Sequence, residues 1–552
     1  MLCNWPPIVY PECARSTGGG LTCASAALSH FIIPMNSDLA KLQRAPRDQA
    51  RWQKAQAQLL GGRHGPALAN YRELVRHYPA LAELWFELGN AASGELDFSL
   101  ANQAYRRALE RAPNNASLLS LIGQQYQGLR QLDDARNCYE RAVAADPDSV
   151  DARISLAVWF EKERRLDEAW DCVAAILAKD PHEDQARYFR ALLLHRKKQN
   201  TEAETALRDL IKEGPQYPYV KYAAPHLLGV VLDQLGQYDE AIHWLLTAKA
   251  QVRTITDTTL LEKSYDDGDR RRRELLAGLT PEMIRRWRQE PPASREDYQI
   301  AFLGGHPRSG TTLLEQVLDA NPAVLAFDEP TAFLHEVEKQ IHFSPSQNAA
   351  GLLDTLSWSR RKEMRRRYVK SLLREVPGQP TQRVLVDKNP SPTMSLNLWL
   401  RVFPELKVII ALRDPRDVVI SCFFLNIMLN ATNVNFLSLE RTAKHYADLM
   451  DVWLRLRELG GFEWIESRYE DVVENLEAEG RKVTEFLGLT WHPDQARSHE
   501  TARRKVLYAP TYHDVTQPVY KRAVGRWERY AAALAPVQAK LAPYCQAFGY
   551  PE

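Results

Sequence analysis

The sequence contains little cysteine, and its most apolar N-terminal stretch is short. Seven cysteines are scattered over 552 residues, too few for a disulfide scaffold, and no close pair of them has the spacing of a zinc site. Residues 21–34 are too few to cross a bilayer and follow a segment with almost no positive charge. We therefore expect a cytoplasmic protein in a reducing environment, with no bound metal and no stable membrane insertion.

An excess of charge of one sign is also absent. The chain has 71 Lys and Arg against 70 Asp and Glu, a formal net charge of +1. Nucleic-acid binding depends on a basic surface that attracts phosphates, so this balance predicts no nucleic-acid partner. The apolar fraction of 45% is that of a globular protein, and the length favours two or three domains.

Residues 1–40 are predicted to form a disordered leader. The flanks of the apolar stretch within it do not favour a signal peptide or an anchor. A second interpretation is that the protein starts at Met35, so it stays open whether residues 1–34 belong to the native protein.

Prolines in the first half recur at a fixed interval. Four consecutive steps of 34 residues separate Pro79, Pro113, Pro147, Pro181 and Pro215. In the same frame, Gly89, Ala101, Tyr105 and Ala108 of one unit correspond to Gly123, Ala135, Tyr139 and Ala142 of the next. Small residues let two helices approach closely, the aromatic side chain fills the groove between them, and proline ends the second helix.

A period of 34 residues is that of a helix–turn–helix unit, and this stretch resembles the tetratricopeptide repeat (TPR) family. We count six units over residues 48–255, which predicts an α-helical TPR solenoid. The concave surface of a solenoid suits a protein or peptide partner, and the alternative is that the array only packs against the rest of the chain. Residues 256–297, with the arginine run 270–273, are predicted to form a helical linker with a solvated face.

Short apolar runs separated by helical stretches characterise residues 298–552. The runs lie at residues 300–303, 324–327, 384–386, 408–412 and 464–465. This alternation predicts an α/β domain with a central parallel sheet. Ligands of such sheets bind at the carboxyl ends of the strands, so the polar residues directly after each run are candidates for a site.

A glycine-rich loop follows the first run, over residues 304–312, and leads into a helical stretch. Backbone N–H groups and the helix dipole at such a turn attract an anion. Gly305 and Gly310 have the spacing of a nucleotide P-loop, but Thr311 stands where the lysine of that loop is expected. This departure argues against ordinary ATP or GTP hydrolysis, while Arg308 still supplies a cation.

Several motifs in order carry a further resemblance. They are Pro-Arg-Ser-Gly-Thr-Thr at 307–312, Asp-Glu at 328–329, Asp-Lys-Asn-Pro at 387–390, and Arg-Asp-Pro-Arg-Asp at 413–417 followed by Ser421. Together they resemble the sulfotransferases that use 3′-phosphoadenylyl sulfate (PAPS), and among these the tyrosylprotein sulfotransferases. The resemblance implies a P-loop-like sulfotransferase domain over residues 298–552. A TPR array ahead of such a domain also resembles a bacterial sulfotransferase architecture.

The resemblance also implies which residues bind PAPS. The loop residues Arg308, Ser309, Gly310, Thr311 and Thr312 match those that hold the 5′-phosphosulfate. Arg413 and Ser421 match the pair that grips the 3′-phosphate, and Tyr469 matches a further contact. Thr511 and Arg526 match a late loop that closes over PAPS.

The catalytic residues implied by the resemblance are Glu329, Arg308 and Lys388. Sulfuryl transfer to a hydroxyl needs a base for its proton and positive charge near the departing phosphate oxygen. Glu329 matches the catalytic glutamate of the tyrosylprotein group, and Lys388 with Arg308 matches the cations that stabilise the bridging oxygen. Taken alone, Glu329 is more typical of a solvated or capping acid.

The acceptor stays open at this stage. Tyrosine of a protein or peptide is the first candidate, with the TPR array as a candidate for its recruitment, and a carbohydrate, lipid or small phenol is the second. Eight basic residues between 360 and 374 form either a solvated helix face or a surface that attracts an acidic peptide or PAPS. Leu425 stands where the tyrosylprotein group often has a phosphate-binding arginine, for which Arg416 is a candidate replacement.

Two other classes of function compete with a sulfotransferase. A nucleotide kinase with the same loop is disfavoured by the missing P-loop lysine. An interaction scaffold with an inactive transferase domain is disfavoured by the presence of all five key residues, which are Arg308, Glu329, Lys388, Arg413 and Ser421.

Overall fold

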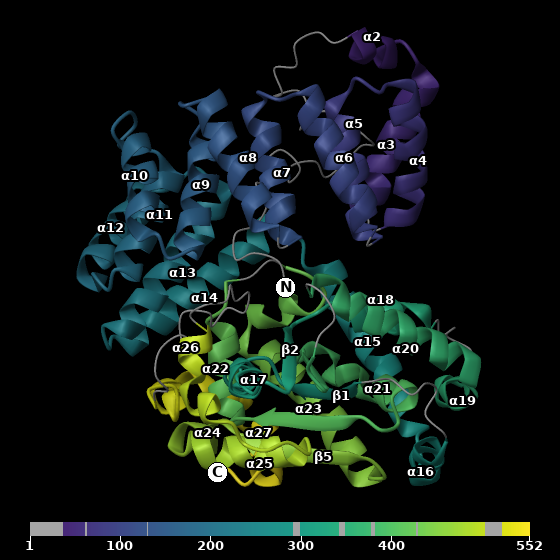
Figure 1. Cartoon of the computed structure of the whole chain (residues 1–552). Helices are drawn as coiled ribbons and strands as arrows, with labels where there is room; N and C mark the ends of the chain where they lie inside the picture. Colours follow the sequence, from purple (N-terminus) through teal and green to yellow (C-terminus); the bar gives the residue numbers. More distant parts are fainter. Residues whose placement is uncertain are drawn as a thin grey trace. The chain divides into compact units, whose positions relative to one another are not determined.

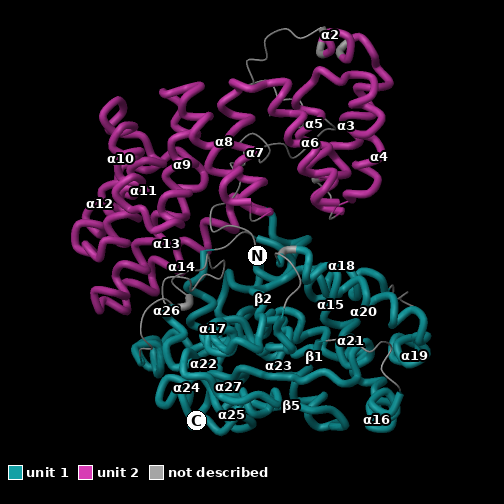
Figure 2. The backbone as a smooth tube through the Cα atoms, in the orientation of Figure 1, with its two compact units in different colours: residues 1–4, 257–552 teal, residues 5–256 magenta. Residues whose placement is uncertain are grey.

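The computed structural model describes residues 37–60, 63–95, 97–129, 131–290, 298–341, 348–376, 381–426, 429–502 and 521–551. Most of the predicted leader, residues 1–36, lies outside these ranges. The chain divides into two compact units, one of residues 5–256 and one that contains residues 257–552 (Figure 2).

The first unit is built of helix pairs that follow α2 (Ser37–Gln43). The pairs are α3 (Pro46–Leu60) with α4 (His64–His77), α5 (Ala82–Gly94) with α6 (Phe98–Arg111), α7 (Ala116–Gly128) with α8 (Leu132–Ala145), α9 (Val150–Lys162) with α10 (Leu166–Leu177), α11 (Asp184–Arg196) with α12 (Asn200–Glu213), and α13 (Pro218–Gln234) with α14 (Tyr238–Ile255). Successive pairs pack on one another, as between α4 and α5 and between α12 and α13. The predicted α-helical TPR solenoid is confirmed.

The contact between small and aromatic residues explains the packing within a pair. A Cβ on Gly89 would lie 2.4 Å from the ring of Tyr105, and a Cβ on Gly123 would lie 2.6 Å from the ring of Tyr139. Both tyrosines are buried. Any larger residue at the glycine position would therefore push the two helices of the pair apart.

The second unit is built around a five-stranded parallel sheet (Figure 1). Its strands are β1 (Gln299–Gly305), β2 (Val324–Asp328), β3 (Val384–Lys388), β4 (Lys407–Leu412) and β5 (Glu463–Arg468), in the spatial order β2-β3-β1-β4-β5. Each predicted apolar run forms one strand, which confirms the α/β fold with a central parallel sheet. The three inner strands, β3, β1 and β4, are buried along almost their whole length, as their apolar sequences require.

Helices cover both faces of this sheet. Leu303 faces α17 (Thr311–Asp319) and α25 (Leu476–Phe486), where Leu314 and Val483 join the same core. The neighbouring Phe302 lies on the opposite face, with its ring 5.2 Å from that of Trp399 on α21 (Leu396–Val402). The remaining helices are α15 (Thr259–Ala277), α16 (Pro281–Gln289), α18 (Ala332–Glu336), α19 (Ala349–Asp354), α20 (Trp358–Leu372), α22 (Pro415–Phe423), α23 (Leu439–Leu459), α24 (Tyr469–Glu474), α26 (Ser498–Ala502) and α27 (Ala531–Ala547). Short 3-10 helices are η2 (Glu338–Gln340), η3 (Leu373–Glu375), η4 (Ser391–Ser395), η5 (Asn433–Leu437), η6 (Pro493–Arg497) and η7 (Arg526–Tyr530).

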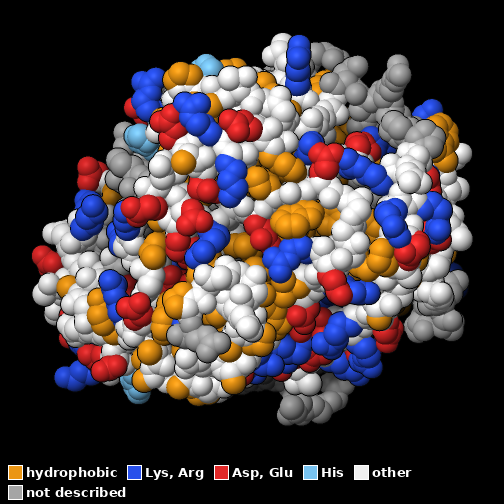
Figure 3. All heavy atoms as spheres, turned by 90° about the horizontal axis from the view of Figure 1, so that it is seen from below, with side chains coloured by type: hydrophobic (Ala, Val, Ile, Leu, Met, Phe, Trp, Pro, Cys, Tyr) orange, Lys and Arg blue, Asp and Glu red, His pale blue; other side chains and the backbone are white. Residues whose placement is uncertain are grey.

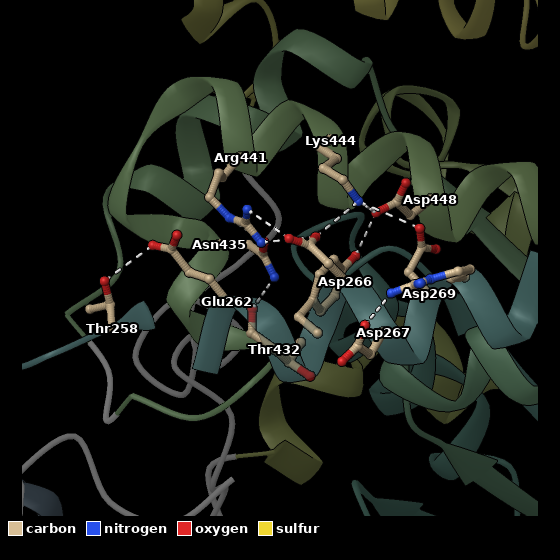
Figure 4. Close-up of polar contacts among 12 residues, drawn as sticks. Thr258, Glu262, Asp266, Asp267, Asp269, Thr432, Asn435, Arg441, Lys444 and Asp448 are labelled. Carbon is tan, nitrogen blue, oxygen red and sulfur yellow. Dashed lines mark hydrogen bonds and ion pairs between the residues drawn. The ribbon is translucent and has the colours of Figure 1, made fainter. Parts of the chain in front are cut away.

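The first helix of the predicted linker, α15, packs against α23 through charged side chains (Figure 4). Arg441 Nη2 donates to Asp266 at 3.2 Å, and Lys444 Nζ lies 3.5 Å from Asp269. The buried Tyr265 donates its hydroxyl hydrogen to Asp448 at 2.9 Å. α15 is therefore a packed element of the second unit, although most of its arginine run is exposed.

The second helix of this segment, α16, is anchored by Trp287. The side chain of Trp287 is 1% exposed, and its indole N–H donates to Asp354 at 2.8 Å. The guanidinium of Arg401 lies 5.4 Å from the Trp287 ring centroid. Residues 256–297 thus contribute two helices to the second unit and are more than a connection between units.

The basic residues between 360 and 374 divide into two groups on α20 and η3. Arg361 and Arg365 are 3% and 2% exposed, and they form ion pairs with Glu290 and Glu405. The other six are exposed. Arg361 and Arg365 therefore hold α20 in place. The prediction of a solvated helix face fits only the other six basic residues.

The surface and the helices add three observations. On the face shown in Figure 3, basic and acidic side chains lie next to one another around hydrophobic patches.

Among the helices of the described ranges, none combines the length and the apolar character that a bilayer span requires. Cys138, Cys172, Cys422 and Cys545 are buried and carry free thiols.

Candidate active site

The predicted site residues follow the carboxyl ends of the five strands. β1 leads into Arg308, β2 into Glu329, β4 into Arg413 and β5 into Tyr469, while β3 ends at Lys388. Because the strands are parallel, these ends lie along one edge of the sheet. Residues that are far apart in the sequence thus gather at the edge where ligands of this fold class bind.

Two glycines determine the path of the loop after β1. Gly305 has φ +119°, and a Cβ there would lie 2.2 Å from the carbonyl oxygen of Ala411 on β4. Gly310 has φ +89° and precedes α17, and a Cβ there would lie 2.6 Å from the ring of Tyr469. Side chains at these positions would be both strained and obstructed, so the loop requires glycine.

The loop ends at the N-terminus of α17. The polar residues at this end are buried, namely Ser309, Thr311 and Thr312. The first backbone N–H groups of a helix lack partners within it, and the helix dipole adds partial positive charge there. This end of α17 is therefore suited to a phosphate or sulfate group.

Four of the predicted PAPS-binding residues are linked by contacts. Arg308 Nε donates to Ser421 Oγ on α22 at 2.9 Å. Arg413 Nη1 donates to the backbone carbonyl of Arg308 at 3.2 Å, and its guanidinium lies 5.0 Å from the Tyr469 ring centroid. Arg413 Nε is buried without a hydrogen-bond partner in the described part of the chain. A buried cationic donor with unused capacity fits an anionic group such as the 3′-phosphate of PAPS.

The late loop is described only in part. Thr511 lies outside the described residues, whereas Arg526 begins η7. Asp417 on α22 accepts hydrogen bonds from the backbone N–H groups of Gly525 at 2.9 Å and Trp527 at 2.8 Å. These bonds bring Arg526 to the helix that also carries Ser421.

Lys388 is fully buried and lies among three carboxylates. Its Nζ bonds to Asp328 and lies 3.7 Å from Glu329 Oε1 and 3.9 Å from Glu315 Oε2. Burial alone lowers the pKa of Lys388, but the three acids outweigh it and raise this pKa above its ordinary value. Lys388 is therefore a fixed positive charge. In the described residues, no group of three or more His, Cys, Asp or Glu side chains is arranged to hold a metal ion.

Glu329 and Arg308 share an uncommon backbone conformation. Their φ angles are +49° and +75°, in the left-handed region that residues other than glycine rarely adopt. Such strain persists only where the surrounding structure imposes it, and it is concentrated at functional sites. The backbone N–H of Glu329 donates to the carbonyl of Lys388 at 2.8 Å, which ties the strained residue to β3. Both side chains are half-buried, so a ligand can reach them.

Arg416, the candidate replacement for the arginine expected at position 425, forms several contacts with other parts of the second unit. Its Nη2 donates to Asp414 at 2.8 Å and to the carbonyl of Pro551 at 2.7 Å. Its guanidinium lies 3.7 Å from the Trp527 ring centroid. These contacts use Arg416 to hold α22 to the end of the chain.

Several residues of this edge were not assigned from the sequence. Asp328 and Glu315 surround Lys388, Asp417 holds the late loop, and Thr393 on η4 accepts from the N–H of Gly305 at 2.9 Å. The sequence offered one indication of Asp328, because it directly precedes Glu329. The structure adds that it pairs in register with Lys388. Glu315 and Thr393 lie in no recognised motif, and only the packing of α17 and η4 brings them to the site.

Profiles of two known families match this chain. The sulfotransferase family matches residues 299–493, and the tetratricopeptide repeat matches residues 120–171 and 171–218. The solved sulfotransferase domain of the Synechococcus PCC 7002 olefin synthase is 19% identical, with a TM-score of 0.33, and covers 48% of this chain and 100% of that domain.

Curated relatives match parts of the chain at low identity. Protein-tyrosine sulfotransferase 1 of Danio rerio is 26% identical over 270 residues, which cover 45% of this chain and 72% of that protein. An uncharacterized protein of Aquifex aeolicus (strain VF5) is 27% identical over 330 residues, which cover 57% of this chain and 40% of that protein. The chain carries a sulfotransferase-family domain that follows an array of tetratricopeptide repeats.

Proposed function

We propose that this protein transfers a sulfuryl group from PAPS to an acceptor hydroxyl, and that tyrosine of a protein or peptide is the first acceptor class. The observation that supports this most directly is the distance of 3.7 Å between Lys388 Nζ and Glu329 Oε1, at the sheet edge that carries the anion-binding loop. A fixed cation beside a partly exposed carboxylate suits a transfer in which one oxygen loses a proton while another gains negative charge.

The residues proposed to hold PAPS are Arg308, Ser309, Gly310, Thr311, Thr312, Arg413, Ser421 and Tyr469, with Thr511 and Arg526 assigned to the closing loop. The two arginines supply charge, and the N-terminus of α17 supplies backbone N–H groups. When bound, PAPS supplies the sulfuryl group.

The catalytic roles in this proposal belong to Glu329, Lys388 and Arg308. Glu329 accepts the proton that the acceptor hydroxyl gives up. Lys388 and Arg308 keep positive charge beside the oxygen from which the sulfuryl group departs. Asp328 and Glu315 keep Lys388 charged and in place, since both lie against its ammonium group. No metal ion is assigned a part.

Tyrosine is preferred as the acceptor because the Danio rerio relative is named a protein-tyrosine sulfotransferase. The exposed basic residues of α20 suit an acidic peptide. In this proposal the TPR array recruits the protein acceptor through its concave surface. A carbohydrate, lipid or small phenol is the second acceptor class.

The proposed location is the cytoplasm. The described cysteines are free thiols, as expected in a reducing compartment.

The test is a transfer assay with sulfur-labelled PAPS and matched acceptors. These are an acidic tyrosine peptide, the same peptide with phenylalanine in place of tyrosine, an oligosaccharide and a small phenol. Label on the tyrosine peptide alone supports the first acceptor class, and label on the sugar or phenol alone moves the assignment to the second. A folded protein that labels nothing and fails to bind the product nucleotide PAP (adenosine 3′,5′-bisphosphate) would overturn the proposal.

Calorimetric titrations separate the rival classes. Tight ATP binding that depends on magnesium, without PAP binding, would indicate a nucleotide kinase. PAP binding without turnover on any acceptor would favour an interaction scaffold with an inactive transferase domain.

A further inference from the structure

Two buried histidines lie at the loop that follows β1 (residues 304–312), and the proposed reaction uses neither. His306 follows β1 directly and is 0% exposed, and His445 on α23 is 1% exposed. Nε2 of His306 lies 2.8 Å from Nδ1 of His445, and the two rings meet edge to face with centroids 4.9 Å apart. The loop that carries Arg308 is thus connected to α23 by the hydrogen bond between the two rings.

The hydrogen bonds assign a tautomer to each ring. Nδ1 of His306 lies 2.8 Å from the carbonyl oxygen of Pro307, which can only accept, so Nδ1 carries the hydrogen. Burial lowers the pKa of His306 to about 4, so the ring is neutral near pH 7 and its Nε2 is an acceptor. His445 then donates from its own Nδ1, and both rings are neutral with the hydrogen on Nδ1.

The acceptor in this chain of bonds is the peptide group between Pro307 and Arg308. Because that group is planar and trans, the N–H of Arg308 points the opposite way from the carbonyl of Pro307, and so away from His306. Arg308 has φ +75° in this orientation. A flip of the peptide would change this φ by about 180° and release the strain, but it would break the bond to His306. Cys422 Sγ, 3.6 Å from the same oxygen, is a second and weaker donor.

His445 is held from several sides. Its ring centroid lies 5.6 Å from that of Tyr265 on α15 and 5.3 Å from that of Phe436 on η5. Tyr265 in turn donates at 2.9 Å to Asp448, which lies one turn further along α23. The orientation of His445 therefore depends on α15 as well as on its own helix.

We infer that His306 is a positioning residue: held in one tautomer by His445, it fixes the Pro307–Arg308 peptide so that the N–H of Arg308 faces the side of the loop opposite the histidines, where the anion binds. This inference rests on the proposed function, because it assumes that the loop binds the phosphosulfate. It concerns residues that touch neither PAPS nor the acceptor.

Two substitutions at His306 separate this role from simple packing. In His306→Asn the amide nitrogen takes the place of Nδ1, so the donor to Pro307 is kept. In His306→Gln the amide reaches the place of Nε2, so the bond to His445 is kept and the donor to Pro307 is lost. We expect full-length His306→Asn to bind PAP within about threefold of the unsubstituted protein, and His306→Gln to bind it at least about tenfold more weakly, with KM for PAPS raised more than kcat is lowered.

A second pair at His445 covers the case in which the His306 variants do not fold. His445→Asn keeps a donor in the place of Nδ1, whereas His445→Leu removes it, so only the leucine variant should lose PAP affinity. Equal PAP affinity within both pairs, or equal losses within both, would overturn the inference.

A spectroscopic measurement tests the tautomers without any ligand. Nitrogen-15 spectra of histidine-labelled protein at pH 7 should show a neutral ring with the hydrogen on Nδ1 for both residues, and a charged ring or an Nε2–H form at His306 would contradict the inference. If the unsubstituted protein fails to bind PAP, the proposed function fails, and this spectrum still decides whether the His306 bond exists.

Discussion

Asp328 at the end of β2 and Lys388 at the end of β3 are partners in the register of the parallel sheet, and their side chains form a buried ion pair. Lys388 is 0% exposed and Asp328 is 9% exposed. Glu315 and Glu329 also lie within 4.0 Å of the same ammonium group, so three acids surround one lysine.

Replacement of Lys388 by methionine should therefore reduce both stability and activity. The change nearly keeps the length of the side chain but removes the ammonium group from the buried ion pair with Asp328. Loss of one partner of such a pair costs about 3–5 kcal/mol. Urea unfolding of the second unit, followed by tryptophan fluorescence, measures this loss. The double variant Lys388→Met/Glu315→Gln should recover part of it, and a fully additive result would show that Glu315 and Lys388 do not interact.

Substitution of Glu329 by glutamine should abolish the base without removing the PAPS site. We expect turnover to fall by about 10²–10⁴-fold, the usual contribution of a general base, with PAP affinity unchanged. The matched control is Glu477→Gln on α25, where the carboxylate is 54% exposed and lies 2.6 Å from Arg481 Nη2. Turnover of Glu329→Gln equal to that of the control would remove the assigned role.

Alanine at Gly310 should prevent anion binding by the loop. Gly310 has φ +89°, and the added Cβ would lie 2.6 Å from the ring of Tyr469. Gly488 has a similar φ of +76° but nothing within 4 Å of a Cβ, so Gly488→Ala adds only backbone strain. Calorimetry should show PAP affinity at least about tenfold weaker for Gly310→Ala and unchanged for Gly488→Ala. Similar losses for both would mean that the obstruction by Tyr469 is unimportant.

The buried histidines should make the second unit less stable in acid. Burial lowers the pKa of His306 from 6.5 to about 4, against a raising effect of the Pro307 carbonyl. Burial, His306, Arg272 and Lys444 all lower the pKa of His445. Because the folded state binds these protons less readily than the unfolded chain, the stabilisation is complete above pH 6.5 and is lost as the pH falls from 6.5 toward 4.

The share of His306 in this loss is about 3 kcal/mol, from the size of its pKa shift. Urea unfolding at a series of pH values should therefore give a shallower acid dependence for His306→Asn than for the unsubstituted protein. Parallel curves would contradict a neutral buried ring.

Trp287→Ala should destabilise the second unit although residue 287 precedes the sheet. The side chain is 1% exposed, and loss of such a group costs about 3–5 kcal/mol. Trp358→Ala on α20 is the control, because Trp358 is 44% exposed and its removal should change the unfolding free energy by less than about 1 kcal/mol. Thermal unfolding compares the two, and equal midpoints would mean that α16 is not part of the cooperative unit.

The sheet and most of the site edge were predictable from the sequence for one physical reason. A parallel strand buried on both faces, such as residues 408–412, is a continuous apolar run, and its polar continuation marks the carboxyl end. Arg308 and Arg413 follow such runs and Lys388 ends one strand, and the resemblance to the PAPS-dependent sulfotransferases implied their roles. The repeat array was also predictable from the sequence, because the close contact between two helices requires glycine opposite tyrosine, and this pair recurs at a fixed interval.

Other features depend on packing that no short pattern encodes. Arg361 and Arg365 occur in a run of basic residues that reads as a solvated face, yet both are buried against acids from distant parts of the chain. Glu315 reaches Lys388 only because of the way α17 crosses the sheet. His445 is surrounded by residues of α15, η5 and the loop after β1, which are far from it in the sequence. Its own sequence context therefore gave no indication of a role.

Helices α15 and α16 have a consequence for how such enzymes can be recombined. The sulfotransferase profile begins at residue 299, but Tyr265 and Trp287 are buried within the same compact unit. A crossover that joins a foreign repeat array at residue 298 would remove both side chains. The surfaces of the second unit on which they pack would then be exposed to water. A crossover after residue 256 keeps them, so the segment that a different repeat array could precede is longer by two helices than the profile suggests.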